Sequence, residues 1–468
     1  MVDQPTVRTV RTLRDAGDEP VVGTRERDLL YVALCGDQPL AGGVAVEVTP
    51  GQVVVIARGP TLAVEPRPGE GEVWLRLPDA RVSERHAVVE LQGDELLFED
   101  LDSLNGSFLG AEPIRTAAIA DGQTIVVGRT VLLFRRRVAR PATHDAFDVA
   151  GAPELRTLSP ETAHIHDLLA RAAGSPVAVL LRGETGVGKE VAARALHALS
   201  RRAGSFVAVN CGALPENLVE SELFGYRRGA FSGATQDRAG VIAAAAGGTL
   251  LLDEIGELPA AAQVKLLRAV QEREVVPLGA ARGEAVRVDF RLVCATHADL
   301  DAQVARGRFR ADLLARIRGL DVELPALRAR RMDIGILIAA LLARHARADA
   351  ASYRFDRRCA QALVAHDYPL NIRELEQALL ALLALAGPER LFRREALAET
   401  TIGRAGAQQP AGRDPDRVRA DLLEQLARHQ GNISAVARAM RCTRMQVHRW
   451  LKRWQIDAEP FRGGGAGR

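Results

Sequence analysis

Hydrophobic residues change their spacing along the chain, and each spacing predicts a different kind of domain. Between residues 46 and 137, short apolar runs with alternating polar positions are separated by Gly, Pro, Asp and Asn. Short strands with a turn about every 8–12 residues are typical of an all-β sandwich. From 154 to 325, apolar runs such as 177–181 and 249–252 alternate with helical stretches, which predicts an α/β domain with a parallel sheet.

The remaining segments are helical or have the composition of linkers. Ala, Leu and Arg recur at helical spacing in 326–398, and a shorter helical pattern follows in 416–457. An apolar patch at 29–34 has no clear period, so we assign it to an N-terminal extension. The predicted segments are an N-terminal extension (1–45), a β-sandwich (46–137), a linker (138–153), an α/β domain (154–325), a helical subdomain (326–398), a second linker (399–415) and a helical bundle with its tail (416–468).

Composition narrows the class of protein. The chain has 468 residues, of which 47% are hydrophobic and 26% charged, an ordinary globular balance. The net charge is only +3, so contact with nucleic acid requires a local basic patch. No apolar run reaches the roughly 18 residues of a membrane span, and the N-terminus has no charged-then-apolar leader. The five cysteines form no CxxC pair, which favours reduced thiols in a cytoplasmic protein.

A glycine-rich loop between a predicted strand and a predicted helix indicates a phosphate site. Its glycines let backbone N–H groups turn toward phosphate oxygens, and the helix N-terminus adds the positive end of its dipole. Only three of the 62 basic residues are lysines, and Lys189 stands in this loop, where a compact ammonium suits β- and γ-phosphates. The expected ATP-binding residues are Gly183, Glu184, Thr185, Gly186, Val187, Gly188, Lys189 and Glu190.

Two adjacent carboxylates end an apolar strand farther along the chain. In GGTLLLDE, the run closes on Asp253 and Glu254, and a buried strand does not tolerate paired acids without a purpose. We expect Asp253 to hold Mg²⁺, directly or through water, and Glu254 to polarise the water that attacks the γ-phosphate. Glu190 is unusual at the end of the first motif, since Ser or Thr normally binds Mg²⁺ there.

Residues 154–398 resemble the central domain of bacterial sigma-54-dependent activators, the NtrC-type AAA+ ATPases. The motifs occur in the family's order, and the family's phosphate loop also carries Glu where Glu190 stands. The resemblance therefore implies ATP hydrolysis in a ring, a homo-hexamer, that remodels sigma-54 RNA polymerase. The matching segments are GETGVGKE (183–190), ELFGYRRGAFSGA (222–234), GGTLLLDEIGEL (247–258), FRADLLARI (309–317) and YPLNIREL (368–375).

The resemblance also implies roles for single residues. Asn210 matches the residue that restrains the catalytic Glu until a partner is engaged, and His297 stands at the sensor I position. Arg310 and Arg316 match the arginines that reach a neighbour's γ-phosphate, and Arg373 matches the sensor II arginine.

A glycine-flanked loop in the second motif matches the segment that touches the sigma factor. An exposed Phe between two glycines forms a mobile hairpin with an apolar tip, and Ser replaces the family's usual Thr beside it. Tyr368 and Leu370 are further departures, since they replace the usual Trp and Gly of the sensor II segment. The loop residues are Gly229, Ala230, Phe231, Ser232, Gly233 and Ala234.

A basic helical pattern near the C-terminus indicates DNA binding. Seven Lys or Arg and no Asp or Glu lie between Arg428 and Trp454, and apolar residues recur at helical spacing. Two helices joined by a tight turn predict a helix-turn-helix for double-stranded DNA, and the pattern resembles the Fis-type module. Thr443 is a suitable N-cap for the second helix. The expected DNA-contact residues are Thr443, Arg444, Gln446, His448, Arg449 and Lys452.

The β-sandwich resembles the forkhead-associated (FHA) fold, which binds phosphothreonine. VSERHAVV places Ser83 and His86 at the family's SxxH positions, and Asn105-Gly106 match its NG pair. Arg58 best matches the phosphate arginine, with Arg67 as an alternative. A sandwich used only for protein contact or dimerisation remains the other interpretation. The expected phosphopeptide residues are Arg58, Ser83, Arg85 and Asn105, with Glu84 opposing phosphate by its charge.

These segments together predict an ATP-driven transcriptional activator. The FHA domain takes the input, the AAA+ ring hydrolyses ATP with Mg²⁺ against sigma-54 polymerase, and the helix-turn-helix binds upstream DNA. The alternative is a DNA-binding phosphopeptide scaffold or repressor whose ATPase is vestigial. ATPase activity together with sigma-54-dependent transcription separates the two.

Overall fold

The structure is a computed structural model. It describes residues 25–67, 69, 71–93, 95–140, 143–281, 284–400, 402, 415–429, 431–440, 447, 450, 451, 454, 456 and 457.

Two six-stranded sheets pack face to face in the N-terminal part of the chain. Their inner faces supply a core of alternating residues such as Val54, Ile56, Val89 and Phe98. The first sheet runs β2 (Ala45–Glu47), β1 (Arg25–Leu34), β12 (Thr130–Arg140), β11 (Thr124–Val127), β8 (Ser107–Leu109), β9 (Glu112–Ile114). The second runs β10 (Thr116–Ile119), β7 (Glu95–Asp100), β6 (Ala87–Gln92), β3 (Val53–Arg58), β5 (Glu72–Leu77), β4 (Ala63–Arg67).

The sandwich begins earlier than the sequence predicted. Strand β1 pairs antiparallel with β12, with Leu30 opposite Phe134, so the boundary at residue 46 is wrong. Leu30 lies in the core between the sheets, whereas Tyr31 on the other face lies in a second core shared with the helical subdomain. A strand buried on both faces is apolar throughout and shows no period of two, which explains why the patch at 29–34 gave no clear signal.

The predicted linker at 138–153 is also partly packed structure. Strand β12 continues to Arg140, whose side chain is fully buried. Its guanidinium donates hydrogen bonds to the carbonyl oxygens of Leu158 (2.7 Å) and Asp145 (2.6 Å). Phe147 pairs with Thr157 in an isolated bridge. The end of the sandwich is therefore tied to the start of the α/β domain.

The α/β domain has a parallel five-stranded sheet with helices on both faces. Successive residues of its strand β17 (Thr249–Asp253) point to opposite faces: Leu250 and Leu252 into one core, Leu251 into the other. The strand order is β14 (Phe206–Asn210), β17 (Thr249–Asp253), β20 (Arg291–Thr296), β13 (Val179–Arg182), β21 (Leu320–Glu323). The helices are α1 (Pro160–Ala172), α2 (Lys189–Ser200), α3 (Glu216–Phe224), α4 (Val241–Ala244), α5 (Ala260–Glu272), α6 (Leu300–Ala305) and α7 (Ala311–Ile317).

Two short antiparallel ribbons extend from this domain. They are β15 (Gly225–Tyr226) with β16 (Arg238–Ala239), and β18 (Glu274–Val275) with β19 (Val286–Arg287).

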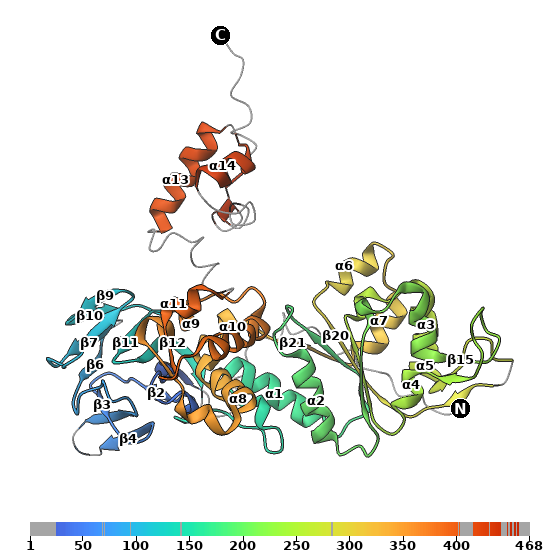
Figure 1. Cartoon of the computed structure of the whole chain (residues 1–468), viewed down its shortest axis with the longest axis horizontal. Coiled ribbons are helices and arrows are strands. Elements are labelled where there is room, and N and C mark those ends of the chain that lie inside the picture. Colours follow the sequence, from blue (N-terminus) through green and yellow to red (C-terminus); the bar gives the residue numbers. More distant parts are fainter. Residues whose placement is uncertain are drawn as a thin grey trace, which may run out of the picture.

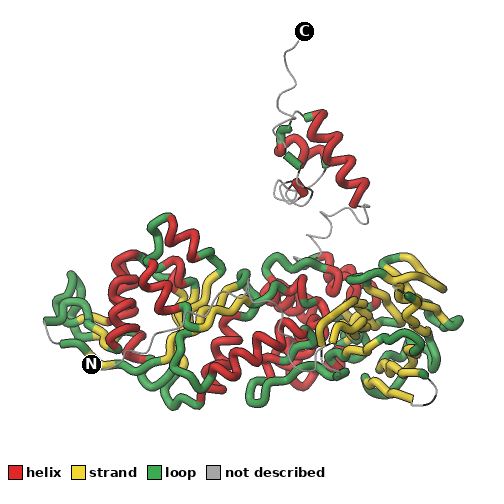
Figure 2. The backbone as a smooth tube through the Cα atoms, turned by 180° about the vertical axis from the view of Figure 1, so that it is seen from behind, coloured by secondary structure: helices red, strands yellow, loops and turns green. Residues whose placement is uncertain are grey.

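The helical subdomain, here called the lid, lies between the sandwich and the α/β domain (Figures 1 and 2). Its core is continuous with the outer face of the first sheet of the sandwich. The contact is close, because a Cβ on Gly335 would lie 2.6 Å from the carbonyl oxygen of Ala33. Arg357 also stacks over the Phe108 ring at 3.6 Å. The lid elements are α8 (Ile334–Ala346), α9 (Arg357–Ala365), α10 (Asn371–Leu385), α11 (Arg394–Ala398) and the parallel pair β22 (Arg354–Phe355) and β23 (Leu391–Phe392).

The C-terminal bundle has its own small core, formed by residues such as Leu422, Leu426, Val436 and Val447. Asn432 caps the second described helix, because its Oδ1 accepts from the Ala435 N–H (3.2 Å). The two helices are α13 (Pro415–Arg428) and α14 (Ile433–Ala439). The predicted DNA-contact residues Thr443, Arg444, Gln446, His448, Arg449 and Lys452 lie outside the described residues. Among the helices that are described, none has the length and apolar character needed to cross a bilayer.

Candidate functional site

The glycine-rich loop joins β13 to α2 in the arrangement expected of a phosphate cradle. Gly183, Gly186 and Gly188 all have positive φ, at 146°, 79° and 109°. Other residues rarely adopt these conformations, so the loop needs glycine. Lys189 is 7% exposed, and its Nζ donates to the carbonyl oxygens of Gly183 (2.9 Å) and Glu184 (3.3 Å). Burial lowers the pKa of this ammonium, and nearby Glu254 opposes the shift.

The lid packs directly on this loop. The Ile372 N–H donates to the carbonyl oxygen of Gly186 (3.0 Å), and Asn371 Nδ2 donates to that of Thr185 (3.0 Å). Arg328 makes two hydrogen bonds to the Glu184 carboxylate, at 2.8 and 2.5 Å. Glu184, Thr185 and Gly186 are therefore each hydrogen-bonded to a lid residue more than a hundred positions away in the sequence.

The lid contacts also place the sensor II segment. Arg373 follows Asn371 on α10, and a Cβ on Gly186 would lie 3.0 Å from the Cβ of Arg373. Tyr368, which replaces the family's usual Trp, is fully buried and donates its hydroxyl to the Leu363 carbonyl oxygen (2.6 Å). Leu370 replaces a usual Gly without needing left-handed backbone, since its φ is −106°. Both departures are thus accommodated.

The two acids stand at the carboxyl end of β17, facing the phosphate loop. Glu254 Oε1 lies 4.0 Å from Lys189 Nζ. Its backbone is left-handed, with φ of 50°, a conformation that is strained for a side chain with a Cβ. Burial, aided by the neighbouring Glu254 charge, raises the pKa of Asp253. One or two carboxylates together with substrate phosphates are the usual ligands of Mg²⁺, so this donor set fits that ion.

His297, not Asn210, makes the polar contact with Glu254. The Glu254 Oε2 lies 2.7 Å from His297 Nδ1 and accepts from the His297 N–H (3.3 Å). Asn210 is paired with Asp253 across the sheet, but its Oδ1 accepts from the N–H groups of Gly212 and Ala213. These bonds use only the acceptor of Asn210, whereas a carboxylate would be held by its Nδ2 donor, so the role of Asn210 toward Glu254 stays a prediction.

The two arginines predicted to reach a neighbour's γ-phosphate, here called the finger arginines, are exposed at opposite ends of α7. Arg310 is the N-cap residue and pairs with Asp312 (2.6 Å). Arg316 lies in the last turn, and no ion pair joins it to another residue of the described chain. Arg316 is thus available to a neighbouring molecule.

The predicted sigma-factor loop extends from the base formed by β15 and β16. Gly229 and Gly233 have φ of 82° and 109°. Phe231 is 43% exposed and packs edge-on against Tyr226, with ring centroids 4.9 Å apart. The loop therefore carries an accessible aromatic ring at the end of a ribbon, as its glycine-flanked sequence predicted.

A buried polar relay, which sequence reasoning missed, joins the sandwich to the phosphate loop. Arg140 donates to Leu158, whose N–H donates to Asp333 Oδ1 (2.6 Å). Asp333 is 1% exposed and lies 4.0 Å from Arg330, which donates to the Val187 carbonyl oxygen (2.8 Å). Nothing in the local sequence signals it, since its members come from four separate segments.

The predicted phosphopeptide residues divide into two groups. Arg58, Ser83 and Asn105 converge at one end of the sandwich: the Arg58 N–H donates to the Ser83 carbonyl oxygen (2.9 Å), and Ser83 Oγ accepts from the Leu104 N–H (3.3 Å). The Asn105 amide donates within the same loops, to the Arg81 carbonyl oxygen (2.9 Å).

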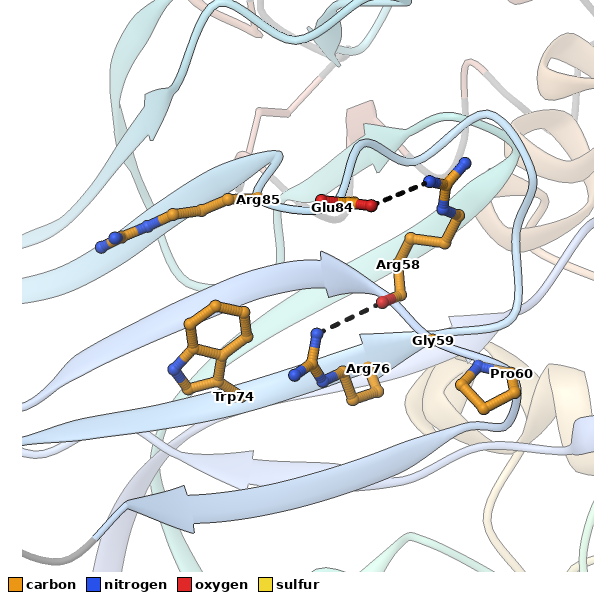
Figure 3. A pocket seen from close by; sticks show the side chains of 7 residues that line it. All are labelled: Arg58, Gly59, Pro60, Trp74, Arg76, Glu84 and Arg85. Atoms are coloured by element: carbon orange, nitrogen blue, oxygen red, sulfur yellow. Dashed lines mark hydrogen bonds and ion pairs between the residues drawn. The ribbon is translucent and has the colours of Figure 1, made fainter.

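Arg85 lines a pocket together with Arg58 and Glu84, but its side chain runs to the far side of it. Figure 3 shows Glu84 directed at the Arg58 guanidinium, 3.7 Å away, and Arg85 pointing away from both. Arg85 instead pairs with Glu72 (3.2 Å), on the side of Trp74. Arg67, the alternative phosphate arginine, stacks on Trp74 at 4.2 Å. The geometry therefore favours Arg58 over Arg67, which does not line this pocket, and the role of Arg85 stays a prediction.

Four family models match the chain in succession. They are an FHA domain (71–128), the Sigma-54 interaction domain (155–323), an AAA+ ATPase lid domain (328–414) and a homeodomain-like domain (414–461). Together they match the later part of the sandwich, the nucleotide domain, the lid and the C-terminal bundle.

Similar curated proteins are transcriptional regulators. The hydrogenase transcriptional regulatory protein HoxA of Bradyrhizobium diazoefficiens is 42% identical over 298 residues, 61% of each chain. ZraR of Escherichia coli is 41% identical over 63% of this chain and 67% of its own. GlrR of Escherichia coli is 37% identical over 69% of this chain and 72% of its own. The match thus spans about two thirds of these relatives.

Among solved structures, NtrX of Brucella abortus in complex with ADP is 30% identical over 64% of this chain and 69% of its own, with a TM-score of 0.49. The family assignment rests on the sequence matches and on the motifs described above. Sigma-54 interaction domains of this kind are AAA+ ATPases. The chain belongs to the sigma-54-dependent AAA+ transcriptional regulators, with an FHA domain before the ATPase and a helix-turn-helix after it.

Proposed function

We propose that this protein hydrolyses ATP in a homo-hexameric ring and uses the motion of residues 229–234 to open promoters bound by sigma-54 RNA polymerase. The observation that carries the proposal is that one domain holds both the phosphate loop with its paired acids and an exposed Phe231 on a glycine-flanked ribbon. Chemistry and a contact surface for a partner are thereby joined by one sheet and its helices.

The residues divide the chemical work. Lys189 and the loop N–H groups hold the phosphates, and Asp253 would hold Mg²⁺, which neutralises charge on the transferred phosphoryl group. Glu254 orients water, and its contact with His297 keeps the carboxylate placed near Lys189. Arg328 and Asn371 carry the position of the lid to the loop.

We assign the input signal to the N-terminal FHA domain and the recognition of DNA to the C-terminal bundle. The FHA domain binds a phosphothreonine protein at Arg58, Ser83 and Asn105, which the structure brings to one end of the sandwich. The C-terminal bundle binds double-stranded DNA upstream of the promoter through the basic residues at 443–452, which lie outside the described residues.

Active sites shared between subunits are expected from the exposed finger arginines. Subunits with Arg316→Ala and subunits with Lys189→Ala should each be inactive, and mixing them should restore part of the ATPase activity. Rescue occurs because some interfaces then combine an intact Lys189 with an intact Arg316. Steady-state ATPase assays on mixed, assembled protein measure it.

The control for this experiment uses two substitutions that both affect the part of the active site contributed by a single subunit. Lys189→Ala and Glu254→Gln subunits should give no rescue on mixing, because both residues come from one chain. Equal ATPase rates in the two mixtures, with assembly verified by light scattering, would contradict the sharing of active sites between subunits.

Replacing Phe231 with Ala should uncouple hydrolysis from promoter opening. The Phe231 side chain packs on Tyr226 and not on the phosphate loop. Basal ATPase activity should therefore stay near the parent rate while open-complex formation is lost. A permanganate footprint on a sigma-54 promoter, beside an ATPase assay, separates the two. Leu385→Ala, which truncates a similarly exposed apolar residue of the lid, is the matched control.

Full promoter opening by Phe231→Ala would overturn the proposed function. Absence of ATPase activity in the parent chain would favour the alternative function, a scaffold or repressor.

A further inference from the structure

A groove lies between the phosphopeptide end of the sandwich and the lid. Its volume is about 580 Å³. Arg58, Pro60 and Asp79 line it from the sandwich, and Ala351 and Arg354 line it from the lid. The arginine that we assign to phosphate therefore shares one hollow with residues of the ATPase.

The acids of this groove are already engaged. Asp79 is 1% exposed and accepts from the N–H groups of Arg81 (2.9 Å) and Arg129 (2.7 Å). Asp37 pairs with the Arg129 guanidinium and accepts from the Ala80 N–H (2.9 Å). The charge of Asp37 is thus paired with Arg129, and both oxygens of Asp79 are turned to backbone N–H groups rather than to an arginine side chain.

The cations of the groove are much less engaged. Arg58 is 47% exposed, and its ion pair is with Glu84, which is itself 91% exposed at 3.7 Å. Arg354 is exposed, and no hydrogen bond or ion pair joins its guanidinium to another residue in the described part of the chain. Two guanidinium groups with so few partners favour an anionic ligand that extends from one to the other.

The lid side of the groove is held by the sandwich itself. Arg354 and Phe355 form β22, and the Phe355 N–H donates to the carbonyl oxygen of Gly36 (2.8 Å), next to Asp37. Phe355 is fully buried in the core common to the sandwich and the lid. The sandwich thus positions Arg354 at the groove that Arg58 also lines.

We propose that this groove extends the phosphopeptide site, so that acidic residues flanking the phosphothreonine contact Arg354 of the lid. The inference rests on the proposed phosphothreonine binding by Arg58. A dianionic phosphate displaces the single, exposed Glu84 carboxylate from Arg58, and the flanking acids then reach the second guanidinium. A bound partner consequently contacts the sandwich and the lid together, and the lid in turn contacts the phosphate loop of the ATPase.

The test uses the full chain and synthetic peptides with a central phosphothreonine, whose flanks are either Asp/Glu-rich or neutral. Fluorescence anisotropy should show that Arg354→Ala weakens binding of the acidic-flank peptides by about two- to fivefold and leaves the neutral-flank peptides unchanged. Arg354→Glu should produce a larger loss with acidic flanks. Arg358→Ala, at another exposed lid arginine that does not line the groove, should change neither.

The outcomes separate the inference from the function on which it rests. Arg58→Ala should weaken every phosphopeptide by roughly ten- to a hundredfold. If the phosphopeptides bind through Arg58 but the Arg354 variants match the parent chain with both kinds of flank, the inference is wrong and the FHA assignment stands. If no phosphopeptide binds the parent chain, both fall, and the sandwich is a protein-contact module.

Discussion

Replacing Glu254 with Gln should reduce ATP hydrolysis by about 10²–10⁴-fold while leaving ATP binding intact. The amide keeps the shape of the side chain and its place beside His297 and Lys189. It removes the negative charge that orients and polarises water, and binding is retained because the phosphates are held by the loop and Lys189. Single-turnover hydrolysis and equilibrium binding of a fluorescent ATP analogue measure the two effects separately.

Two variants complete this experiment. Lys189→Ala should abolish nucleotide binding, because the buried ammonium is the cation at the centre of the loop. Glu257→Gln makes the same chemical change three residues farther on, at an exposed position, and should hydrolyse ATP at the parent rate. Hydrolysis by Glu254→Gln at the parent rate would show that another group orients the water.

The chemistry of the nucleotide site is predictable from sequence because each of its parts is local. A loop of eight residues and a strand that ends in two acids carry their function in consecutive positions, and the parallel sheet brings them together. His297 follows the adjacent strand β20, and although the resemblance places it at sensor I, no local pattern indicates its contact with Glu254. The turn after Asn210 is likewise invisible in a local pattern, although it engages the Asn210 Oδ1.

The association of the sandwich with the lid is not predictable in this way. Gly335 and Ala33 are in contact although some three hundred residues separate them, and the glycine is needed because its neighbour is a backbone oxygen. The apolar stretch in β1 serves two cores at once, which removes the alternation that marks an ordinary strand. Only the structure shows that an input domain and an ATPase lid share one hydrophobic core.

The buried relay through Asp333 should contribute strongly to the stability of the fold. Asp333→Ala should destabilise the protein by about 3–5 kcal/mol, because Arg330 then stays buried without a compensating charge. Leu158 and Thr157 also lose the acceptor of their hydrogen bonds, both at 2.6 Å. Burial raises the pKa of Asp333 and lowers that of Arg330, so each partner depends on the other to remain charged. Thermal unfolding of the full chain should show the loss, and ATP binding should weaken because Arg330 supports Val187 in the phosphate loop.

A double variant tests whether the loss comes from the unpaired charge. Arg330→Met added to Asp333→Ala should recover part of the stability, since it removes the buried guanidinium and keeps an apolar chain of similar length. ATP binding should not recover with it, because the hydrogen bond to Val187 is absent from the double variant. Asp367→Ala, which removes an exposed lid aspartate paired with Arg331, should change the unfolding temperature little. If the effects of Arg330→Met and Asp333→Ala simply add, the two residues are not coupled, and the sandwich does not reach the phosphate loop through them.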